Sequence, residues 1–466
     1  MTNRLDRDPA DLTACEAVAA LRAGSLDRAA LGERVLGRAR RHGALNGWIT
    51  LDEETLARVD QVDGPLCGLP IACKDNIESA ALPTTAGTPA LEQWRPNRDA
   101  PALSRLLAAG GVLAGKTNLH ELGFGVTSNN ARFGPVRNPY NLDRVAGGSS
   151  GGTAALVAAR VVPAGLGTDT GGSVRIPAAL CGVVGFRPTH GRYPGAGVVP
   201  ISPTRDTVGV IARTASDVAL LDRLLDRDPP RISAPASLSI RIGVPRAFFY
   251  ENLDPDVAAV SQQALDALSA LGVELVEEDL PRVEALDAAA GFPIALYEGR
   301  RALERYLEAV PGVNLITLAQ RAASPDVRTI LTSLLDRPLE SAVYRQALGA
   351  RDELRAAYHA YFQQHQVAAI ALPTVPLPAP PIGDDITTPL NGREVPVFPT
   401  LSRNTNPGSL AGIPGLSLPL ALPSDHPPVG LELDAPRGAD EALLALGVAL
   451  QARLPRLPAP DAILRA

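Results

Sequence analysis

The sequence predicts an α/β fold in which helices cover both faces of a β-sheet. Two observations support this prediction. Helical patterns alternate along the chain with short apolar runs, and 45% of the 466 residues are hydrophobic, enough for a substantial core. Such alternation is typical of a sheet packed between helical layers. The length alone allows one large domain or two to three ordinary ones.

Helices are expected where apolar residues recur every three to four positions. These segments are Leu26–Arg41, Ala102–Ala109, Thr153–Arg160, Pro255–Leu271, Ser341–Gln364 and Asp440–Arg453. Short uninterrupted apolar runs predict strands at Gly68–Ala72, Val112–Ala114, Val161–Leu166, Ile240–Pro245 and Val367–Leu372.

Two further segments bear on the chain's organisation. The uncharged stretch Asn404–Ser424 is long enough to span a bilayer, but its prolines and glycines would break such a helix. We expect buried strand and loop there instead. The segment Asp228–Ser237, with the sequence DPPRISAPAS, is the clearest internal linker.

Two glycine-serine clusters, Gly147–Gly152 and Thr170–Ser173, are the first candidates for chemistry. Glycine beside serine lets the backbone approach a ligand and direct consecutive N–H groups at it, as an oxyanion hole requires. Ser149 and Ser173 are therefore candidate nucleophiles. A serine hydroxyl is a weak nucleophile until a base takes its proton.

The candidate base is a lysine. The chain contains two lysines, Lys74 and Lys116, against 42 arginines. Arginine keeps its proton, whereas a buried lysine can shift from a pKa of about 10.4 toward neutrality. Lys74 lies just after the apolar run Gly68–Ala72, at the mouth of a predicted buried strand. For either lysine alone, chance survival is an equally good interpretation, and Lys116 is expected to tolerate arginine.

Three motifs together suggest a family. GLPIACKDN (Gly68–Asn76), GGSSGG (Gly147–Gly152) and GTDTGGSVR (Gly167–Arg175) agree in residue type, order and distance with the amidase signature family of serine hydrolases, which the chain therefore resembles. Ser173 follows Ser149 by 24 residues, which is the family's spacing.

This resemblance implies a catalytic triad and an acyl-enzyme mechanism. Ser173 would attack the substrate, Ser149, held by a cis peptide bond, would relay the proton, and Lys74 would accept it. The oxyanion would be held by the backbone N–H groups of Thr170, Gly171, Gly172 and Ser173. Neither a metal ion nor a cofactor is expected.

The resemblance also implies the domain organisation. The family folds as a single α/β/α domain with a large mixed sheet, so residues 1–466 are expected to form one domain. The linker Asp228–Ser237 would then cross between halves of one sheet. The helix-rich region of about residues 281–364 is expected to cap the active-site cleft.

Composition limits the partners and the compartment. The net charge of −6 is spread without long runs, so nucleic acid and anionic membranes are not expected partners. The four cysteines form no CxxC pair, and the N-terminal segment lacks an apolar targeting region. We expect a cytoplasmic enzyme with a small-molecule amide substrate. The sequence leaves a monomer and a homodimer open.

Two other motifs support rival functions. Gly110–Thr117 matches a phosphate loop, but a helical pattern precedes it and a strand pattern lies within it, the reverse of the order that such a loop requires. A nucleotide-binding module remains the alternative from another class. Gly147–Gly151 matches GxSxG, which would make Ser149 the nucleophile of a hydrolase elbow. That elbow needs a preceding strand, and Arg137–Ala146 is interpreted as a turn-rich loop.

A zinc site is not expected. His120 and Glu121 begin a string like HExxH, but no second histidine follows, and the other histidines are scattered.

The substrate is suggested by sub-family resemblance. Long stretches of the chain are similar to indoleacetamide hydrolases and to arylacetamide and mandelamide amidases: Asn118–Gly152, Cys181–Thr207, Phe292–Glu298 and Leu372–Gly383. This similarity implies a neutral, aryl-bearing amide. Anilides and carbamates, the latter as in a urethanase, stay open, as does the A subunit of a glutamyl-tRNA amidotransferase.

The pocket is expected around two segments. The candidate substrate-binding residues are Gly125, Val126, Thr127, Ser128, Tyr193 and Ile201. The absence of clustered arginine in Gly125–Ser128 argues against an anionic acyl group. Where the family commonly has asparagine before its A-G-[LI]-P motif, this chain has Leu410. That departure puts a polar contact from this point in doubt.

Overall fold

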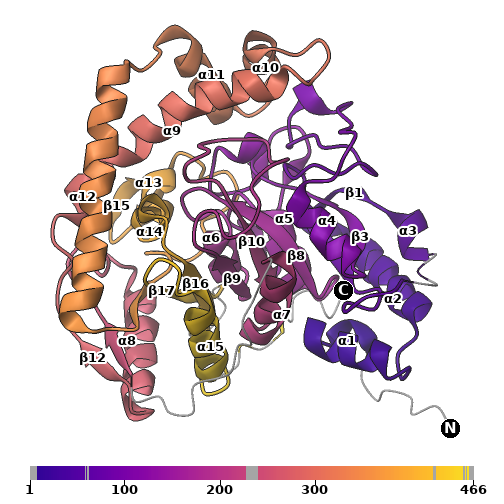
Figure 1. Ribbon diagram of the computed structural model, residues 1–466, viewed down its shortest axis with the longest axis horizontal. Helices are drawn as coiled ribbons and strands as arrows, with labels where there is room; N and C mark the ends of the chain where they lie inside the picture. The colour runs from indigo at the N-terminus through magenta and orange to yellow at the C-terminus, as the bar shows by residue number, and fades with distance from the viewer. Residues whose placement is uncertain are drawn as a thin grey trace.

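The computed structural model describes residues 8–57, 59, 62–226, 240–422, 427–454, 457 and 459–460. An 11-stranded mixed sheet runs through this part of the chain, and helices lie on both of its faces (Figure 1). The predicted α/β fold with a large mixed sheet is therefore confirmed. The predicted linker Asp228–Ser237 lies outside the described residues, and the extent of the domain stays a prediction.

The sheet consists of two halves that are consecutive in sequence. In spatial order, the first half contains β1 (Trp48–Leu51), β3 (Val112–Thr117), β2 (Pro70–Lys74), β8 (Ala164–Asp169), β10 (Thr207–Ala212) and β9 (Val184–Arg187). The second half continues with β16 (Gly415–Leu420), β17 (Val429–Asp434), β13 (Ala369–Pro373), β11 (Arg241–Gly243) and β12 (Glu274–Val276). The antiparallel pair β9–β16 joins the halves.

The parallel strands in the first half bring three chain segments to one edge. β2 runs parallel to both β3 and β8, so the carboxyl ends of all three meet there. Side chains alternate along β2: Ile71 and Cys73 pack into one hydrophobic cluster, whereas Ala72 packs into the cluster on the other face. Lys74, two residues after Ala72, shares that second face.

Helices fill both faces of the sheet. They comprise α1 (Ala14–Arg22), α2 (Arg28–Arg41), α3 (Glu53–Ala57), α4 (Pro101–Ala108), α5 (Gly151–Ala158), α6 (Arg175–Leu180), α7 (Ala215–Leu225), α8 (Pro255–Ala270) and α15 (Asp440–Gln451). α5 is apolar all round and buried along its whole length, as expected for a helix packed inside the core. The six helices expected from periodicity are present, displaced by no more than about two residues at either end.

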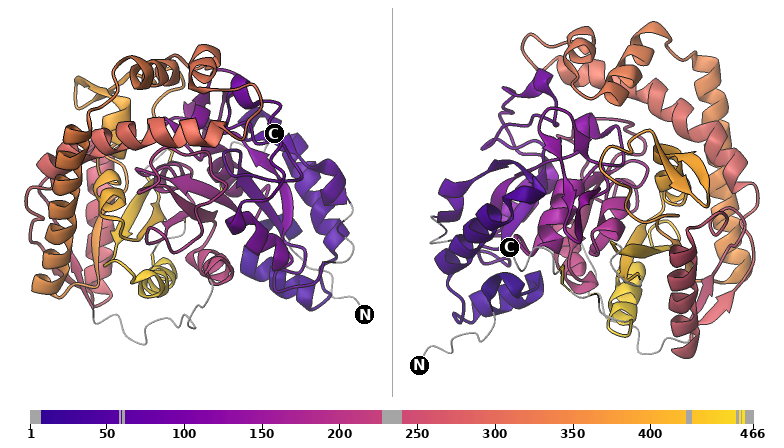
Figure 2. Two further views of the ribbon diagram at one scale, coloured as in Figure 1. Left: turned by 45° about the horizontal axis from the view of Figure 1, so that its top comes forward. Right: turned by 180° about the vertical axis from the view of Figure 1, so that it is seen from behind.

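A second group of helices arches over the sheet (Figure 2). The group comprises α9 (Val283–Leu307), α10 (Leu315–Arg321), α11 (Pro325–Asp336) and α12 (Ser341–His365). α9 and α12, each of 25 residues, pack against one another. The expected helix-rich region is therefore present. The short helices α13 (Val397–Ser402) and α14 (Asn406–Ala411) lie beneath it.

One expectation about a loop is wrong, and another is incomplete. Asn141–Val145 forms strand β7 and pairs with β6 (Arg137–Asn138), because the Asn138 side chain bonds the carbonyls of Val145 and Leu180 and holds the hairpin together. β7 lies in a separate two-stranded sheet. Asn404–Ser424 contains the expected strand, β16, but also helix α14. There Pro407 occupies the first turn, where its missing N–H costs nothing.

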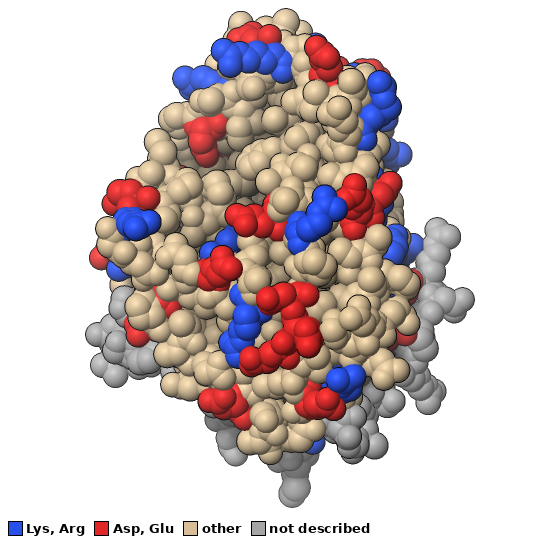
Figure 3. All heavy atoms as spheres, turned by 90° about the vertical axis from the view of Figure 1, so that its left-hand side faces the viewer, with Lys and Arg blue, Asp and Glu red and all other residues tan. Residues whose placement is uncertain are grey.

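The surface carries both signs of charge. On the face shown in Figure 3, acidic and basic side chains alternate and do not gather into a patch of one sign. Within the described ranges, no helix is both long and apolar enough to cross a bilayer.

Candidate active site

Lys74 lies at the end of β2 with its side chain fully buried. Its Nζ atom is 2.7 Å from Ser149 Oγ and 2.8 Å from Thr168 Oγ1. Asn76 Nδ2 donates a second hydrogen bond to Thr168 Oγ1 at 3.0 Å. These contacts hold the amine between the carboxyl end of β8 and the first glycine-serine cluster.

The pKa of the Lys74 amine is lowered to about 7. Burial is the main cause, because it disfavours the charged form, and the charges of Asp169 and Asp206 only partly oppose it. Among the described residues, no carboxylate lies within ion-pair distance of Lys74 Nζ. A substantial fraction of the amine is therefore neutral near pH 7 and can accept a proton.

Ser149 is positioned by a tightly packed backbone. The Gly148–Ser149 peptide bond is cis. A Cβ atom on Gly148 would lie 2.9 Å from Ser128 N, and one on Gly152 would lie 2.3 Å from Asn118 O. Only glycine fits at these two positions. The local sequence thus fixes where the Ser149 hydroxyl points.

Hydrogen bonds to the Asp169 carboxylate hold the loop that carries Ser173. This carboxylate accepts hydrogen bonds from Gly172 N at 2.8 Å, Val174 N at 3.2 Å and Arg175 Nε at 3.0 Å. Burial alone would raise the pKa of Asp169, but Arg175 and the backbone donors outweigh it and lower the pKa to about 2. The Gly172 N–H, expected to bind an oxyanion, is therefore already engaged with a carboxylate.

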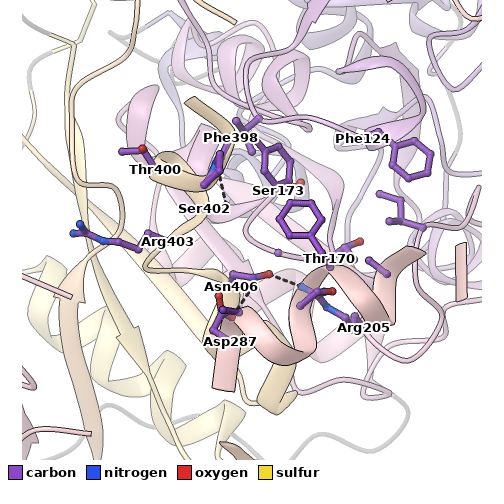
Figure 4. Close-up of a pocket in the computed structure, with 18 of the residues that line it drawn as sticks. Phe124, Thr170, Ser173, Arg205, Asp287, Phe398, Thr400, Ser402, Arg403 and Asn406 are labelled. Carbon is purple, nitrogen blue, oxygen red and sulfur yellow. Dashed lines mark hydrogen bonds between the residues drawn. The ribbon is translucent and has the colours of Figure 1, made fainter. Parts of the chain in front are cut away.

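A cavity of about 510 Å³ opens onto Ser173. Gly123, Thr170 and Gly171 also line it, and a Cβ on Gly123 would lie 3.5 Å from Ser149 Oγ. Its apolar walls include the four rings of Phe124, Phe248, Phe292 and Phe398. Figure 4 shows the polar residues Asp287, Asn406 and Arg205 on the opposite side from Phe124. The cavity thus joins the candidate nucleophile to a roomy, largely aromatic pocket.

Two of the six expected pocket residues, Val126 and Ile201, line this cavity. Four do not, and the prediction is corrected for them: Gly125, Thr127, Ser128 and Tyr193. A Cβ on Gly125 would lie 2.2 Å from the His120 ring. The Ser128 hydroxyl accepts a hydrogen bond from Gly151 N at 3.1 Å and so supports the start of α5.

Thr127 and Tyr193 are likewise committed to structural bonds. Thr127 Oγ1 donates to Asp385 at 2.8 Å. The Tyr193 ring lies in the core, and its hydroxyl donates to Asp222 at 2.6 Å.

The sequence did not identify the other walls of the cavity. Most of them come from α9, α11 and α13: Glu284, Asp287, Ala288, Gly291, Phe292, Ala295, Leu296, Ile330, Leu334, Phe398, Pro399, Thr400 and Ser402. The expected helical cap was the one signal that pointed to them. Arg205 and Arg403 also line the cavity, and the sequence argument from the absence of clustered arginine did not take them into account. It considered Gly125–Ser128 alone.

Leu410 is buried in the core and contributes no polar contact. Asn406, one helical turn earlier on α14, points into the cavity instead. Its Nδ2 donates to Asp287 Oδ1 at 2.7 Å, and its Oδ1 accepts from Arg205 Nη2.

Lys116 lies in a closed, buried site. It is fully buried, and its Nζ lies 3.1 Å from Asp75 Oδ1, 2.9 Å from Thr84 Oγ1 and 3.1 Å from Pro83 O. The expectation that Lys116 tolerates arginine stays a prediction, and these contacts show that a larger guanidinium would have to enter a closed site.

The rival motifs have structural roles. Helix α4 precedes Gly110–Thr117 and strand β3 lies within it, so the reversed order expected from the sequence is confirmed. His120 Nε2 lies 2.8 Å from Asp326 on α11, and Glu121 accepts hydrogen bonds from Ala323 N and Ser324 N. In the part of the chain that the structure describes, no cluster of three metal-ligating side chains occurs.

Comparisons with known proteins identify the family to which this chain is similar. The amidase family model matches residues 39–444. An indoleacetamide hydrolase from Rhizobium radiobacter is 43% identical over 90% of this chain and 92% of its own length. A mandelamide hydrolase from Pseudomonas putida is 38% identical over 97% and 93%. A crystal structure of an amidase superposes with a TM-score of 0.86 at 35% identity, covering 95% of this chain and all of the other.

Proposed function

The chain belongs to the amidase family and is a hydrolase of non-peptide carbon–nitrogen bonds in amides, and we propose that its substrate is a neutral, aryl-bearing amide. The proposed mechanism passes through an acyl-enzyme on Ser173. The observation that carries it is the 2.7 Å contact of Lys74 Nζ with Ser149 Oγ, made by a buried amine that has no carboxylate partner in the described ranges.

The first half-reaction forms the acyl-enzyme. Neutral Lys74 accepts the Ser149 hydroxyl proton while Ser149 accepts the proton of Ser173, whose oxygen attacks the amide carbon. The tetrahedral oxyanion is stabilised by backbone N–H groups of the loop that do not bind Asp169, and we assign this role to Thr170, Gly171 and Ser173. As the C–N bond breaks, the proton returns from Lys74 through Ser149 to the departing nitrogen.

The second half-reaction releases the acid. Water loses a proton to the same relay and attacks the acyl carbon, and the Ser173 oxygen leaves with that proton. The carboxylic acid is released and the three side chains regain their starting protonation. Because Lys74 supplies the base, the proposed mechanism requires neither a metal ion nor a cofactor.

The pocket supports the substrate class. Four phenylalanine rings line a cavity of about 510 Å³, a size and lining typical of sites for small apolar ligands. The arginines are balanced there by Glu284 and Asp287, and Arg205 is engaged with Asn406 and with Gly291 O. A neutral aryl group suits this lining, and the volume leaves room for the leaving group of an anilide or a carbamate.

The proposed compartment is the cytoplasm. Cys15, Cys67, Cys73 and Cys181 are all free thiols, which suits a reducing compartment.

A substrate panel tests this function. Purified protein is assayed with indole-3-acetamide and phenylacetamide against glutamine and malonamate, with and without a chelator. We expect higher kcat/KM for the arylacetamides and no effect of the chelator. Preference for malonamate, or loss of activity to the chelator, would contradict the proposal. Preference for glutamine would favour the amidotransferase subunit.

The nucleophile is tested separately. An acylating probe should label Ser173, as located by peptide mass spectrometry, and Ser173→Ala should abolish both labelling and turnover. Ser149→Ala should keep a trace of activity, because the oxyanion donors and Ser173 remain. A label on Ser149 would favour the hydrolase elbow.

A further inference from the structure

Asp287 is a carboxylate in the pocket wall that the proposed mechanism does not use. It lies on α9 and is half-buried. Its Oδ1 accepts a hydrogen bond from Asn406 Nδ2 at 2.7 Å, and Asn406 Oδ1 accepts from Arg205 Nη2 (Figure 4). Arg205 Nη1 in turn donates to Gly291 O, at 2.8 Å, one turn further along α9. The three side chains form one fixed polar chain.

This chain is tied to the loop that carries the nucleophile. A Cβ atom on Gly171 would lie 2.9 Å from Asn406 Oδ1 and 3.5 Å from Arg205 Nη2. The polar chain therefore packs directly against the backbone at Gly171. The position of the Asp287 carboxylate is consequently set relative to the candidate nucleophile, and Asp287 and Ser173 line the same cavity.

The second carboxylate oxygen is available to a ligand. In the described ranges, no residue donates a hydrogen bond to Asp287 Oδ2, and no arginine lies within ion-pair distance of it. Once a ligand fills this largely apolar pocket, a carboxylate oxygen that the ligand leaves without a donor is buried unpaired, which is unfavourable. Burial raises the pKa of Asp287 to about 6, against the opposing charge of Arg205, so the group is ionised at pH 8.

We propose that Asp287 is a specificity-determining residue whose Oδ2 accepts a hydrogen bond from an N–H or O–H group on the aryl part of the substrate. This inference rests on the proposed function and narrows its substrate class. Aryl amides with a ring donor are selected over amides of the same shape that lack one, because the latter leave the carboxylate unpaired.

A matched pair of substrates tests this selection. Indole-3-acetamide has a ring N–H, and 1-benzothiophene-3-acetamide has a ring sulfur in its place. The wild type should favour the indole by about 10- to 100-fold in kcat/KM, the range of a hydrogen bond to a charged group. Asp287→Leu should bring this ratio close to one, and Asp287→Asn, which keeps a neutral acceptor, should give an intermediate ratio.

Two controls separate recognition from structure. A merely structural role of Asp287 would lower kcat/KM for both amides alike and leave the ratio unchanged. Glu284 lines the same pocket one turn earlier on α9, and Glu284→Gln should leave the ratio at its wild-type value. If Glu284→Gln lowered the ratio as much as the Asp287 substitutions do, the assignment to Asp287 would be overturned.

Binding measurements on an inactive variant distinguish a failure of the Asp287 inference from a failure of the proposed function. Dissociation constants of both amides are measured by calorimetry with Ser173→Ala and with Ser173→Ala combined with Asp287→Asn or Asp287→Leu. Preference for the indole that falls in the double variants supports the inference even without turnover. Equal binding of the two amides, or no binding of either, overturns it. Binding without hydrolysis by the wild type overturns the proposed function instead.

Discussion

The two lysines of this chain occupy neighbouring strands and are both fully buried, yet their surroundings differ. In the parallel pair β2–β3, Cys73 is aligned with Lys116 and Lys74 with Thr117. Lys116 faces the carboxylate of Asp75 at 3.1 Å. Lys74 contacts the hydroxyls of Ser149 and Thr168 instead. Burial is shared, so the partner is what separates a structural ion pair from a candidate base.

This difference explains how one edge of the sheet serves two purposes. At Lys116, a carboxylate at contact distance favours the charged form of the ammonium group. The Lys74 amine has hydroxyls at contact distance instead, the charges of Asp169 and Asp206 only partly oppose burial, and its pKa falls. Substitutions at the two lysines should therefore have different effects: loss of activity at Lys74 and loss of stability at Lys116.

The largest expected effect is on activity at Lys74. Lys74→Met and Lys74→Arg should each lower kcat/KM by about 10²–10⁴-fold, the usual contribution of a positioned general base. Arginine is as damaging as methionine because it cannot accept a proton. Near wild-type turnover by Lys74→Arg, measured on a correctly folded variant, would show that the base is misassigned.

The next effect is on stability at Lys116. Lys116→Met leaves Asp75 buried without its cation, which should cost about 3–5 kcal/mol of unfolding free energy. Asp75→Asn combined with Lys116→Met removes both charges and should recover part of that loss. Denaturant unfolding of the single and double variants measures this. Equal stability of Lys116→Met and the wild type would mean that the ion pair is not needed.

The pH profile sharpens the comparison further. Since the Lys74 pKa is lowered to about 7, the amine is protonated and inactive below this pH and neutral above it. We expect kcat/KM to rise through pH 7 and then level off. Residual activity of Lys74→Met should lack this inflection. A flat wild-type profile from pH 6 to 8 would argue against a titrating base.

The smallest effect is expected at Thr168. Its Oγ1 accepts hydrogen bonds from Lys74 Nζ and from Asn76 Nδ2. Thr168→Val removes an acceptor that favours the charged amine, so the inflection should move to lower pH. Activity at the plateau should fall by about tenfold as the amine loses its orientation. Thr168→Ser, which keeps the hydroxyl, is the matched control and should retain both values.

The sequence indicated the tight turns near the candidate catalytic residues better than it indicated the pocket walls, for a physical reason. Lys74, Ser149 and Ser173 each lie in a short contiguous motif whose glycines permit the close backbone approach that the structure shows at Gly148 and Gly152. Local sequence is sufficient to mark such turns. The α/β fold could also be predicted from the sequence, because the periodicities of strands and helices are local properties.

The pocket walls depend on contacts between distant segments. The ring centroids of Phe292 on α9 and Phe398 on α13 lie 5.7 Å apart, although no local sequence pattern links the two residues. Thr127 and Tyr193 look like pocket residues in sequence but donate to Asp385 and Asp222. Such pairings arise only when the chain is folded, so neither composition nor spacing could identify them.

The most direct test uses the scarcity of lysine in this chain. Lysine-selective ¹⁵N labelling of the whole protein produces two side-chain Nζ signals, and the signal missing from Lys74→Met is assigned to Lys74. The account predicts that this signal titrates near pH 7, as a neutral amine forms. A Lys74 signal that stays an ammonium up to pH 9 would contradict the claim that Lys74 is the base.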